Sequence, residues 1–580
     1  MNAIAGEYRA AARDAKAAWG PTQTAAGLIL AFGCAVPWIA PGWVHVDVLA
    51  AWLYLALAAT GLGLTVGIAG LPSLGQGAFM SIGAFTTALL AARAGWSADA
   101  AVPVAVGASL VAGLLAGLVV VRQPPLFLAV STWILSWLVL LVALEFPGVA
   151  GGSQGYVVTS SLSTTGHYEL ALLLTATAVA ALSALRRSNI GIRLRAHRDD
   201  PAAAAGLGVP TRRLLLGAFV ASSAVGGLAG SLAVQLAGVS DPNAFGPFTS
   251  FELLAAVLLG GASYACAGIA GVAILGAVAL LGHAWAAVQG DAPAQLQPML
   301  ASLLLLAILG VGGQGLIPLL VGPRGRSPSP PDLARDPAAP AIGGPAALSA
   351  RGLRKHYGGV HALDGLDLEV GPGETVALVG ANGSGKTTVL RALSGALPLD
   401  AGEIALDGRP LTALRPEALA QAGIVRTLQR TATFGNLTVL ENALVGAGLR
   451  ARHSGPVRLL VATPKARAEA RRSREAAIEA LRTVGLDRLA DVHAELLDGF
   501  QRRLLMIAAA LATRPRLLLL DEPSAGAGRS EISRLAAILT DVRATGVSLL
   551  LVEHNFQLVQ AVADRVVVMS DGKEASTGVS

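Results

Sequence analysis

Long apolar stretches dominate the first 320 residues of the chain and constrain its fold more than any other feature. Most of them are close to the roughly 20 residues that a helix needs to cross about 30 Å of hydrocarbon. Hydrophobic residues make up 53% of the sequence and charged residues only 14%, a balance that a bilayer accommodates and water does not. The charge-poor stretches lie at residues 24–40, 48–70, 74–92, 101–121, 126–145, 169–185, 214–236, 252–288 and 297–320.

The stretch at residues 252–288 is long enough for two crossings, or for one crossing with a re-entrant segment. We therefore expect a polytopic all-α membrane domain of about 8–10 helices over residues 24–320. Glycine or proline interrupts many of the stretches, and a membrane tolerates such breaks only where neighbouring helices or a water-filled cavity satisfy the freed backbone groups. The interruptions favour a transport pathway over a simple anchor.

Arginine is distributed unevenly among the loops. Because Lys and Arg are retained on the cytoplasmic side, this distribution predicts how the membrane domain is oriented in the bilayer. The segment from Arg186 to Arg213 holds seven arginines and is predicted to be cytoplasmic. Residues 1–23 are also expected to be cytoplasmic, since they lack the short apolar core and cleavage site of a signal peptide. Arg93 falls on the external side in this scheme. The other loops expected outside carry no Lys or Arg: residues 146–168, 237–250 and 289–298.

Cysteine content and charge exclude other classes of protein. Cys34 and Cys266 are the only cysteines and both lie in apolar runs, so neither a disulfide framework nor a cysteine zinc site is expected. The formal net charge is +6, but the arginines lie mainly beside apolar spans and in helical parts without interleaved aromatic residues. This pattern favours contact with membrane lipid and not with nucleic acid.

The composition changes after residue 320. Residues 321–347 are rich in Pro and Ala without hydrophobic periodicity, which is typical of a semi-extended linker. Beyond them, short β-type runs alternate with amphipathic helical runs, as in a mostly parallel α/β domain. We expect this second domain over residues 348–580, in the cytoplasm, with a nucleotide site at the strand ends.

A predicted strand runs into the sequence GANGSGKTT, which contains a P-loop. Its glycines allow backbone N–H groups to curl around phosphate at a helix N-terminus. Lys386 is expected to reach the β- and γ-phosphates of ATP, and Thr387 to offer a hydroxyl to Mg²⁺. The nucleotide-binding residues predicted in this segment are Gly380, Asn382, Gly383, Ser384, Gly385, Lys386, Thr387 and Thr388.

Two acidic residues follow a later apolar strand that runs from Leu517 to Leu520. Asp521 is predicted to be a Mg²⁺ ligand at the sheet edge, and Glu522 a general base acting on the attacking water. A surface turn after a buried strand would explain one acid, but not this pair combined with a P-loop.

Residues 347 to about 575 resemble ATP-binding cassette proteins, particularly those serving branched-chain amino acid uptake. The resemblance rests on LRKHYGGVHALDGLDLEV, the P-loop, IVRTLQ, LTVLENALVGA, QRRLLMIAAALATRP, LLLLDEP and LLVEHNFQLV, which fall in family order. It implies that Tyr357 stacks on adenine, that Gln429 senses Mg²⁺ and the permease, and that His554 contacts the γ-phosphate. Each residue also has a plainer interpretation, as a packing aromatic, a solvated amide or a strand-end histidine.

The sequence departs from this family at the signature motif, which in such cassettes grips the γ-phosphate of the ATP held by a partner cassette. The aligned stretch runs from Leu496 to Gln501, with Gly499 retained and Leu497 in place of the serine. Loss of a hydrogen bond from a hydroxyl to phosphate costs roughly 1.5–3 kcal/mol. Closure of the cassette dimer around ATP is therefore expected to weaken by about ten- to a hundredfold. We expect this chain to keep its own ATP site intact but to offer the partner cassette a weakened half-site. The alternative is that Leu497 is a tolerated substitution without functional consequence.

Residues 48–320 resemble permease subunits of the same uptake family, through GLTVGIAGLPSLGQGAFMSIGAF, GGSQG, NIGIRLRAHRDDPAAAAGLGV and SFELLAAVLLGGA. The resemblance implies a coupling helix in the arginine-rich loop, with Arg198, Asp199 and Asp200 near its centre, and uncoupling of ATP hydrolysis from uptake when Asp200 is substituted. A plain positive-inside loop would need the arginines but not the acidic pair. The small residues at 73–83 fit either helix packing or substrate contact.

The combined resemblance implies a fused permease and ATPase subunit that imports branched-chain or related amino acids across the bacterial inner membrane, using ATP and Mg²⁺. It also implies a second permease subunit, a second cassette subunit and an external substrate-binding protein as partners. Three alternatives stay open: import of another small solute such as an amide, urea or an aromatic acid; an exporter half-transporter, which the short polar loops disfavour; and a nucleotide-binding membrane regulator whose altered signature has ended turnover.

Overall fold

The structure is a computed structural model that describes residues 45–289 and 344–579, apart from gaps at 413, 428–432 and 451–463, with isolated residues between 303 and 317. Four predicted features lie wholly or largely outside the described residues: the segment 1–23, the spans at 24–40 and 297–320, and the linker 321–347. The chain divides into two compact units. The first comprises Met1–Ser183 and Leu215–Pro323, and the second comprises Ala184–Leu214 and Arg324–Ser580.

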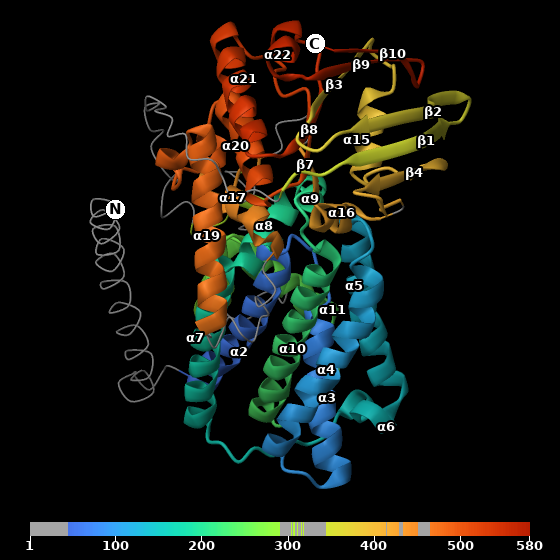
Figure 1. The fold of residues 1–580 in the computed structure, drawn as a ribbon. Coiled ribbons are helices and arrows are strands. Elements are labelled where there is room, and N and C mark those ends of the chain that lie inside the picture. The colour runs from blue at the N-terminus through green and yellow to red at the C-terminus, as the bar shows by residue number, and fades with distance from the viewer. Residues whose placement is uncertain are drawn as a thin grey trace. The chain divides into compact units, whose positions relative to one another are not determined.

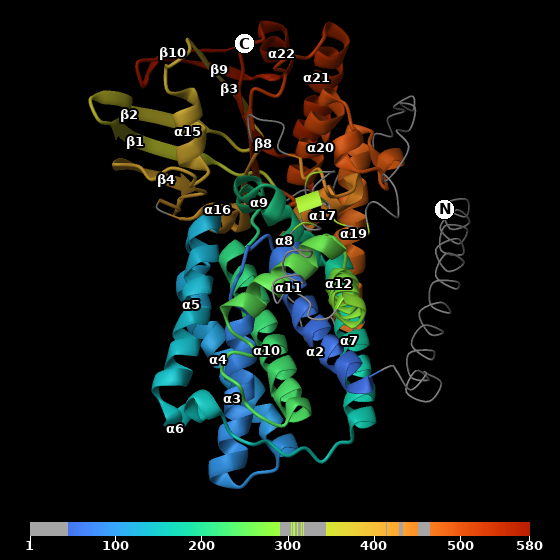
Figure 2. The same ribbon diagram turned by 180° about the vertical axis from the view of Figure 1, so that it is seen from behind.

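The membrane domain is helical, and within the described residues six helices are long and apolar enough to cross a membrane (Figures 1 and 2). They are α2 (Val46–Gly63), extended by a π-helical turn (Leu64–Ile68), α3 (Gln76–Ala94), α4 (Ala98–Val120), α5 (Pro125–Glu145), α7 (Thr164–Arg187) and α10 (Thr211–Ala237). A short helix, α6 (Pro147–Ala150), follows α5. These helices confirm the predicted polytopic all-α domain.

The apolar stretch expected at residues 252–288 holds two helical segments, α11 (Pro247–Gly260) and α12 (Ala267–Gln289). The two helices pack on each other and on α2. Their approach depends on glycine, because a Cβ atom on Gly271 would lie 1.7 Å from the carbonyl oxygen of Ala256.

The small residues of α3 and the turn before it pack helices together. The Ser81 hydroxyl donates to the carbonyl of Phe245 at 3.0 Å, and the Gly77 N–H donates to the Ser250 hydroxyl at 2.9 Å. A Cβ atom on Gly83 would lie 2.1 Å from the carbonyl oxygen of the α10 residue Gly227. These contacts favour helix packing over substrate contact for this segment.

Two sheets form the α/β part of the second unit. An antiparallel sheet has the order β2-β1-β4-β5, and a larger sheet has the order β10-β9-β3-β8-β7-β6. Strands β6, β7, β8, β3 and β9 pair in parallel, whereas β9 and β10 pair antiparallel. The strands are β1 (Leu348–Tyr357), β2 (Val360–Val370), β3 (Thr375–Gly380), β4 (Ala401–Leu406), β5 (Arg409–Pro410), β6 (Ile424–Arg426), β7 (Leu517–Asp521), β8 (Ser548–Val552), β9 (Arg565–Ser570) and β10 (Lys573–Val579). The parallel sheet confirms the α/β domain.

Two large hydrophobic cores and a smaller cluster around Ala377 lie in the described part of the second unit. One lies around β3 and α15 and includes Leu378, Val389 and Leu390; the other joins α8, α9, α17, α19 and α20. The helices of this unit are α8 (Asn189–Asp199), α9 (Pro201–Gly206), α15 (Lys386–Leu393), α16 (Pro416–Ala422), α17 (Val439–Ala447), α19 (Pro464–Val484), α20 (Gly499–Ala512), α21 (Arg529–Ala544) and α22 (Phe556–Val562). The arginine-rich segment therefore shares a core with the helical part of the cassette.

Candidate functional site

The P-loop lies between β3 and α15, and its turn depends on glycine. Gly383 and Gly385 have φ angles of 88° and 102°, which residues with a Cβ atom rarely adopt. A Cβ atom on Gly385 would also lie 2.5 Å from the carbonyl oxygen of Ala362. The turn places Lys386 at the first position of α15.

The Lys386 side chain is buried and folds back into this loop. Its Nζ donates to the carbonyl oxygens of Gly380 at 2.8 Å and Ala381 at 2.7 Å. Burial lowers the pKa of Lys386, and the charge of Glu522 opposes that shift. A bound phosphate would offer the ammonium a charged acceptor in place of two neutral carbonyls. Of the other predicted residues, Ser384 is buried, Thr387 and Thr388 are half-buried and Asn382 is exposed.

Asp521, the last residue of β7, forms a buried ion pair with Arg426 of β6. Arg426 Nη2 donates to Asp521 Oδ2 at 2.8 Å. Burial raises the pKa of Asp521, while the hydrogen bond and the charge of Arg426 lower it. The second carboxylate oxygen, Oδ1, is buried and has no hydrogen-bond partner in the described part of the chain.

This arrangement fits a Mg²⁺ ion bound together with nucleotide. Mg²⁺ is usually held by one or two protein oxygens plus substrate phosphates, and Asp521 Oδ1 and the Thr387 hydroxyl are oxygens of that kind. Among the residues that the structure describes, no group of three His, Cys, Asp or Glu side chains could hold a metal by itself. The phosphates would therefore complete the coordination.

Glu522 and His554 lie together at the carboxyl ends of β7 and β8. Glu522 has a φ of +47°, a conformation uncommon for residues other than glycine, and its N–H donates to the Val552 carbonyl at 2.9 Å. His554 Nε2 lies 3.5 Å from Glu522 Oε1, and both side chains are partly exposed. A solvent-accessible carboxylate oriented by a histidine is suited to act as general base on a water molecule.

Reasoning from the sequence missed Glu553, which fixes the two loops carrying these residues. Its buried carboxylate accepts from the Ser524 N–H at 2.7 Å and from the N–H groups of His554 and Asn555 at 2.9 and 3.1 Å. The available signal was its position directly after a Leu-rich strand, which is also the position of Asp521.

The family resemblance implies two further site residues, Tyr357 and Gln429. Tyr357, at the end of β1, is 47% exposed, and Lys355 Nζ lies 5.8 Å from its ring centroid. The exposed ring is available for stacking. Gln429 lies outside the described residues.

The signature segment differs from a phosphate-binding turn in two respects. Leu497 is 4% exposed and belongs to the core that joins α17, α19 and α20. Asp498 caps α20: its Oδ1 accepts from the Gln501 N–H at 2.7 Å, and its own N–H donates to Gln501 Oε1 at 3.2 Å. Gly499 is the first residue of α20. A carboxylate thus occupies the helix N-terminus, where an anion would otherwise bind.

The predicted coupling residues lie at a junction between two helices, which corrects the expected position near the centre of one helix. Arg198 and Asp199 end α8, and Asp200 caps α9 by accepting from the N–H groups of Ala202 and Ala203 at 2.9 and 2.8 Å. The helix breaks because Asp200 precedes a proline, and residues before proline are disfavoured in the helical region.

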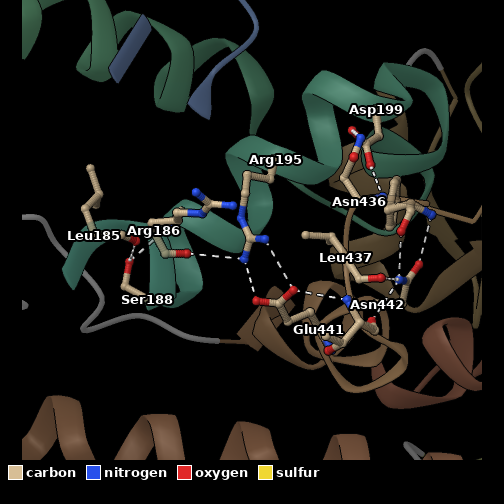
Figure 3. Close-up of polar contacts among 12 residues, drawn as sticks. Leu185, Arg186, Ser188, Arg195, Asp199, Asn436, Leu437, Glu441 and Asn442 are labelled. Atoms are coloured by element: carbon tan, nitrogen blue, oxygen red, sulfur yellow. Dashed lines mark hydrogen bonds and ion pairs between the residues drawn. The ribbon is translucent and has the colours of Figure 1, made fainter. Parts of the chain in front are cut away.

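One contact of α8 with the cassette comes from a residue that was not predicted. Arg195 forms an ion pair with Glu441 of α17, and Asp199 accepts hydrogen bonds from Asn436 (Figure 3). The partners are 246 and 237 positions apart in sequence, so no local motif marks them.

Comparisons with known proteins agree with this architecture. Residues 44–309 match the branched-chain amino acid transport system permease component, and residues 363–525 match the ABC transporter family. The high-affinity branched-chain amino acid transport ATP-binding protein BraF of Pseudomonas aeruginosa is 37% identical over 232 residues, 40% of this chain and 91% of that protein. LivG of Escherichia coli, described in the same words, is 34% identical with the same coverage.

Two further proteins are similar to the cassette. The fructose import ATP-binding protein FrcA of Rhizobium meliloti is 34% identical over 226 residues, 38% of this chain and 83% of that protein. A crystal structure of a nucleotide-free ATP-binding cassette from an ABC transporter is 30% identical, covers 40% of this chain and 91% of that chain, and has a TM-score of 0.36.

The fold and the site define a polytopic membrane domain joined to a nucleotide-binding cassette. The chain belongs to the ABC transporter family, as an importer subunit in which a permease of the branched-chain amino acid type and an ATPase are fused.

Proposed function

We propose that the chain takes up branched-chain or related amino acids across a bacterial inner membrane, driven by hydrolysis of Mg-ATP. The observation that carries this proposal is the match of residues 44–309 to a branched-chain amino acid permease component, joined in one chain to a cassette similar to BraF and LivG. The similarity to the fructose import protein favours a second candidate, import of another small solute.

In the proposed mechanism, the chain's own residues bind and orient the nucleotide. Lys386 exchanges its two carbonyl partners for phosphate oxygens, and Tyr357 stacks on adenine. Asp521 and Thr387 would hold Mg²⁺, and the ion would neutralise charge on the phosphates. Glu522 accepts a proton from the attacking water, and His554 orients that carboxylate. Gln429 is proposed to sense the ion and the permease.

We further propose that a second permease subunit, a second cassette and an external binding protein complete the importer. The weakened half-site around Leu497 then serves the partner's ATP, whereas this chain's own site keeps Lys386, Asp521, Glu522 and His554. A heteromeric complex has one competent and one impaired site, and a homomeric complex has two impaired sites. Equal ATP turnover by the homomeric and heteromeric complexes would contradict this asymmetry.

Substrate choice is tested with labelled solutes. The complete complex, with its binding protein, is reconstituted in proteoliposomes with Mg-ATP on the cassette side and presented with leucine, isoleucine, valine, fructose, ribose or urea. The proposal predicts accumulation of the branched-chain amino acids above the sugars. Accumulation of a sugar or urea alone supports the second candidate, and ATP binding without accumulation of any solute supports a regulator.

A further inference from the structure

Helices α3, α5 and α6 pack on one another in the membrane domain (Figures 1 and 2), and a cavity of about 270 Å³ lies among them. Eight of the nine described residues that line it have apolar side chains. The ninth is Thr86, whose hydroxyl donates to the Ile82 carbonyl of its own helix at 2.7 Å. An apolar cavity of roughly 150 Å³ stays dry and accepts a benzene ring. The larger cavity in this domain therefore suits a hydrocarbon ligand.

The cavity opens to the surface of the membrane domain. Three of its lining residues are exposed, namely Leu138 and Val142 of α5 and Val149 of α6. Two others, Phe85 of α3 and Ala143 of α5, are buried. Helix α5 is long and apolar enough to cross a membrane, and the exposed apolar side chains of such a helix are suited to contact with hydrocarbon. An acyl chain therefore has access to the cavity from the bilayer.

Arg93 lies one helical turn beyond the lining residue Leu89, on the same face of α3. Its Nε donates to the Tyr156 hydroxyl at 3.0 Å, and that hydroxyl donates to the Pro147 carbonyl at 3.0 Å. The tyrosine thus holds the guanidinium against α6. A Cβ atom on Gly148, the neighbour of the α6 lining residue, would lie 3.7 Å from Arg93 Nη2 and 3.8 Å from Nη1. Both terminal nitrogens of the arginine therefore lie beside the mouth of the cavity.

The position of Arg93 along α3 corresponds to the depth of lipid headgroups. Trp96 lies two residues beyond the end of α3 and is 47% exposed, and tryptophan is enriched at the membrane–water interface. Arg93 is itself exposed and forms no ion pair with a carboxylate in the part of the chain that the structure describes. It is also the exception among regions predicted to be external, which otherwise carry no Lys or Arg. A bound anion would account for an arginine at this place.

We propose that this cavity binds an acyl chain of an anionic phospholipid, with the lipid phosphate at the Arg93 guanidinium. The planar guanidinium suits a phosphate group, and the apolar lining suits the chain. An amino acid fits less well, because it carries an ammonium group and no carboxylate is among the described lining residues. The lipid site goes beyond the proposed transport function and stands or falls independently of it.

Native mass spectrometry of the full-length chain in detergent tests the headgroup contact, with phosphatidylglycerol and phosphatidylcholine of identical acyl chains as probes. The wild-type chain is expected to bind one phosphatidylglycerol about tenfold more tightly than phosphatidylcholine, since the arginine meets a lipid with net negative charge. Arg93→Ala is expected to abolish this preference, and Arg93→Lys to keep part of it. The control, Arg122→Ala, removes an exposed arginine just beyond α4 and is expected to leave the preference unchanged.

A second pair of variants tests the cavity itself. Val142→Trp places a large side chain at the exposed rim and is expected to weaken binding of both lipids about tenfold, because the ring occupies the space of the chain. Its control is Leu141→Trp, an exposed neighbour on α5 that is not among the lining residues, and thermal unfolding shows whether each variant keeps its fold.

Four results would overturn the lipid site. Two of them are equal binding of the two lipids by the wild-type chain and an equal loss of binding in both tryptophan variants. Displacement of the lipid by leucine would assign the cavity to a transported solute. A change in subunit stoichiometry with Val142→Trp, without loss of lipid, would assign it to a partner subunit. A preference for phosphatidylglycerol that needs Arg93, with binding that is lost only in Val142→Trp, supports the proposal.

Discussion

Arg426 Nη2 lies 2.8 Å from Asp521 Oδ2, and both side chains are almost fully buried, at 7% and 0% exposure. The pair leaves Asp521 Oδ1 without a protein partner in the described part of the chain. One carboxylate oxygen is thus fixed by the arginine, and the other is the oxygen that we propose binds Mg²⁺. Arg426 therefore fixes the orientation of the predicted Mg²⁺ ligand.

Substitution of Arg426 is expected to act on Mg²⁺ dependence and on stability. Arg426→Lys keeps the charge but not the planar fork, so the Mg²⁺ concentration for half-maximal ATP binding is expected to rise about tenfold. Arg426→Met leaves a buried, uncompensated carboxylate and is expected to cost about 3–5 kcal/mol of unfolding free energy. Magnesium titrations and thermal unfolding check the two effects. A methionine variant with wild-type unfolding and wild-type Mg²⁺ dependence would refute the role given to the pair.

Glu522→Gln is expected to separate binding from hydrolysis. The amide cannot accept the proton of the attacking water, so hydrolysis is expected to fall at least about 100-fold, with Mg-ATP affinity kept. In the proposed mechanism His554 orients this carboxylate, so adding His554→Ala to Glu522→Gln is expected to lower the rate little further; a direct contact of His554 with the γ-phosphate, as the family resemblance implies, would instead lower it markedly. Steady-state phosphate release measures the hydrolysis rate of each variant, and equilibrium nucleotide binding measures its Mg-ATP affinity. A Glu522→Gln variant that hydrolyses ATP at the wild-type rate would assign the base elsewhere.

Leu497→Ser tests the signature half-site, with Leu497→Ala as its matched control. Both variants empty a buried position and are expected to lose about 2–5 kcal/mol of stability through the cavity. The serine alone restores a hydroxyl for phosphate, so the assembled complex is expected to hydrolyse ATP about ten- to a hundredfold faster with serine than with alanine. Equal rates for the two variants would show that the leucine is a tolerated substitution.

Asp200 is expected to matter as a helix cap and not as a charge. Its Oδ1 accepts from two backbone N–H groups of α9, and asparagine can make the same bonds. Asp200→Ala is expected to cost about 1 kcal/mol in α9 and to lower ATP-driven uptake more than ATP hydrolysis, whereas Asp200→Asn is expected to behave as wild type. Paired uptake and hydrolysis assays decide this. Equal uncoupling by both variants would instead point to the negative charge.

Features written in contiguous sequence could be predicted, because their physical cause is local. The glycine spacing of the P-loop, the Leu-rich strand before Asp521 and the apolar stretches each determine a local structure. The junction at Asp200 was misplaced, although Pro201 carried the signal for a helix break.

Pairings between distant elements could not be predicted. Arg426 and Asp521 are 95 positions apart, and Arg195 and Glu441 are 246 positions apart. The sequence offers many arginines and many carboxylates that could form ion pairs. Only the register of the strands and the packing of the helices determine which of them meet. The same holds for Leu497, whose sequence position shows the missing hydroxyl but not the burial of the side chain.

Labelled leucine uptake into proteoliposomes of the complete complex shows whether nucleotide turnover in the cassette drives solute across the helical domain. We expect accumulation with Mg-ATP on the cassette side, and none with Mg-ADP or when Lys386→Ala prevents nucleotide binding. Accumulation that is equal with ADP, or that survives Lys386→Ala, would contradict this expectation.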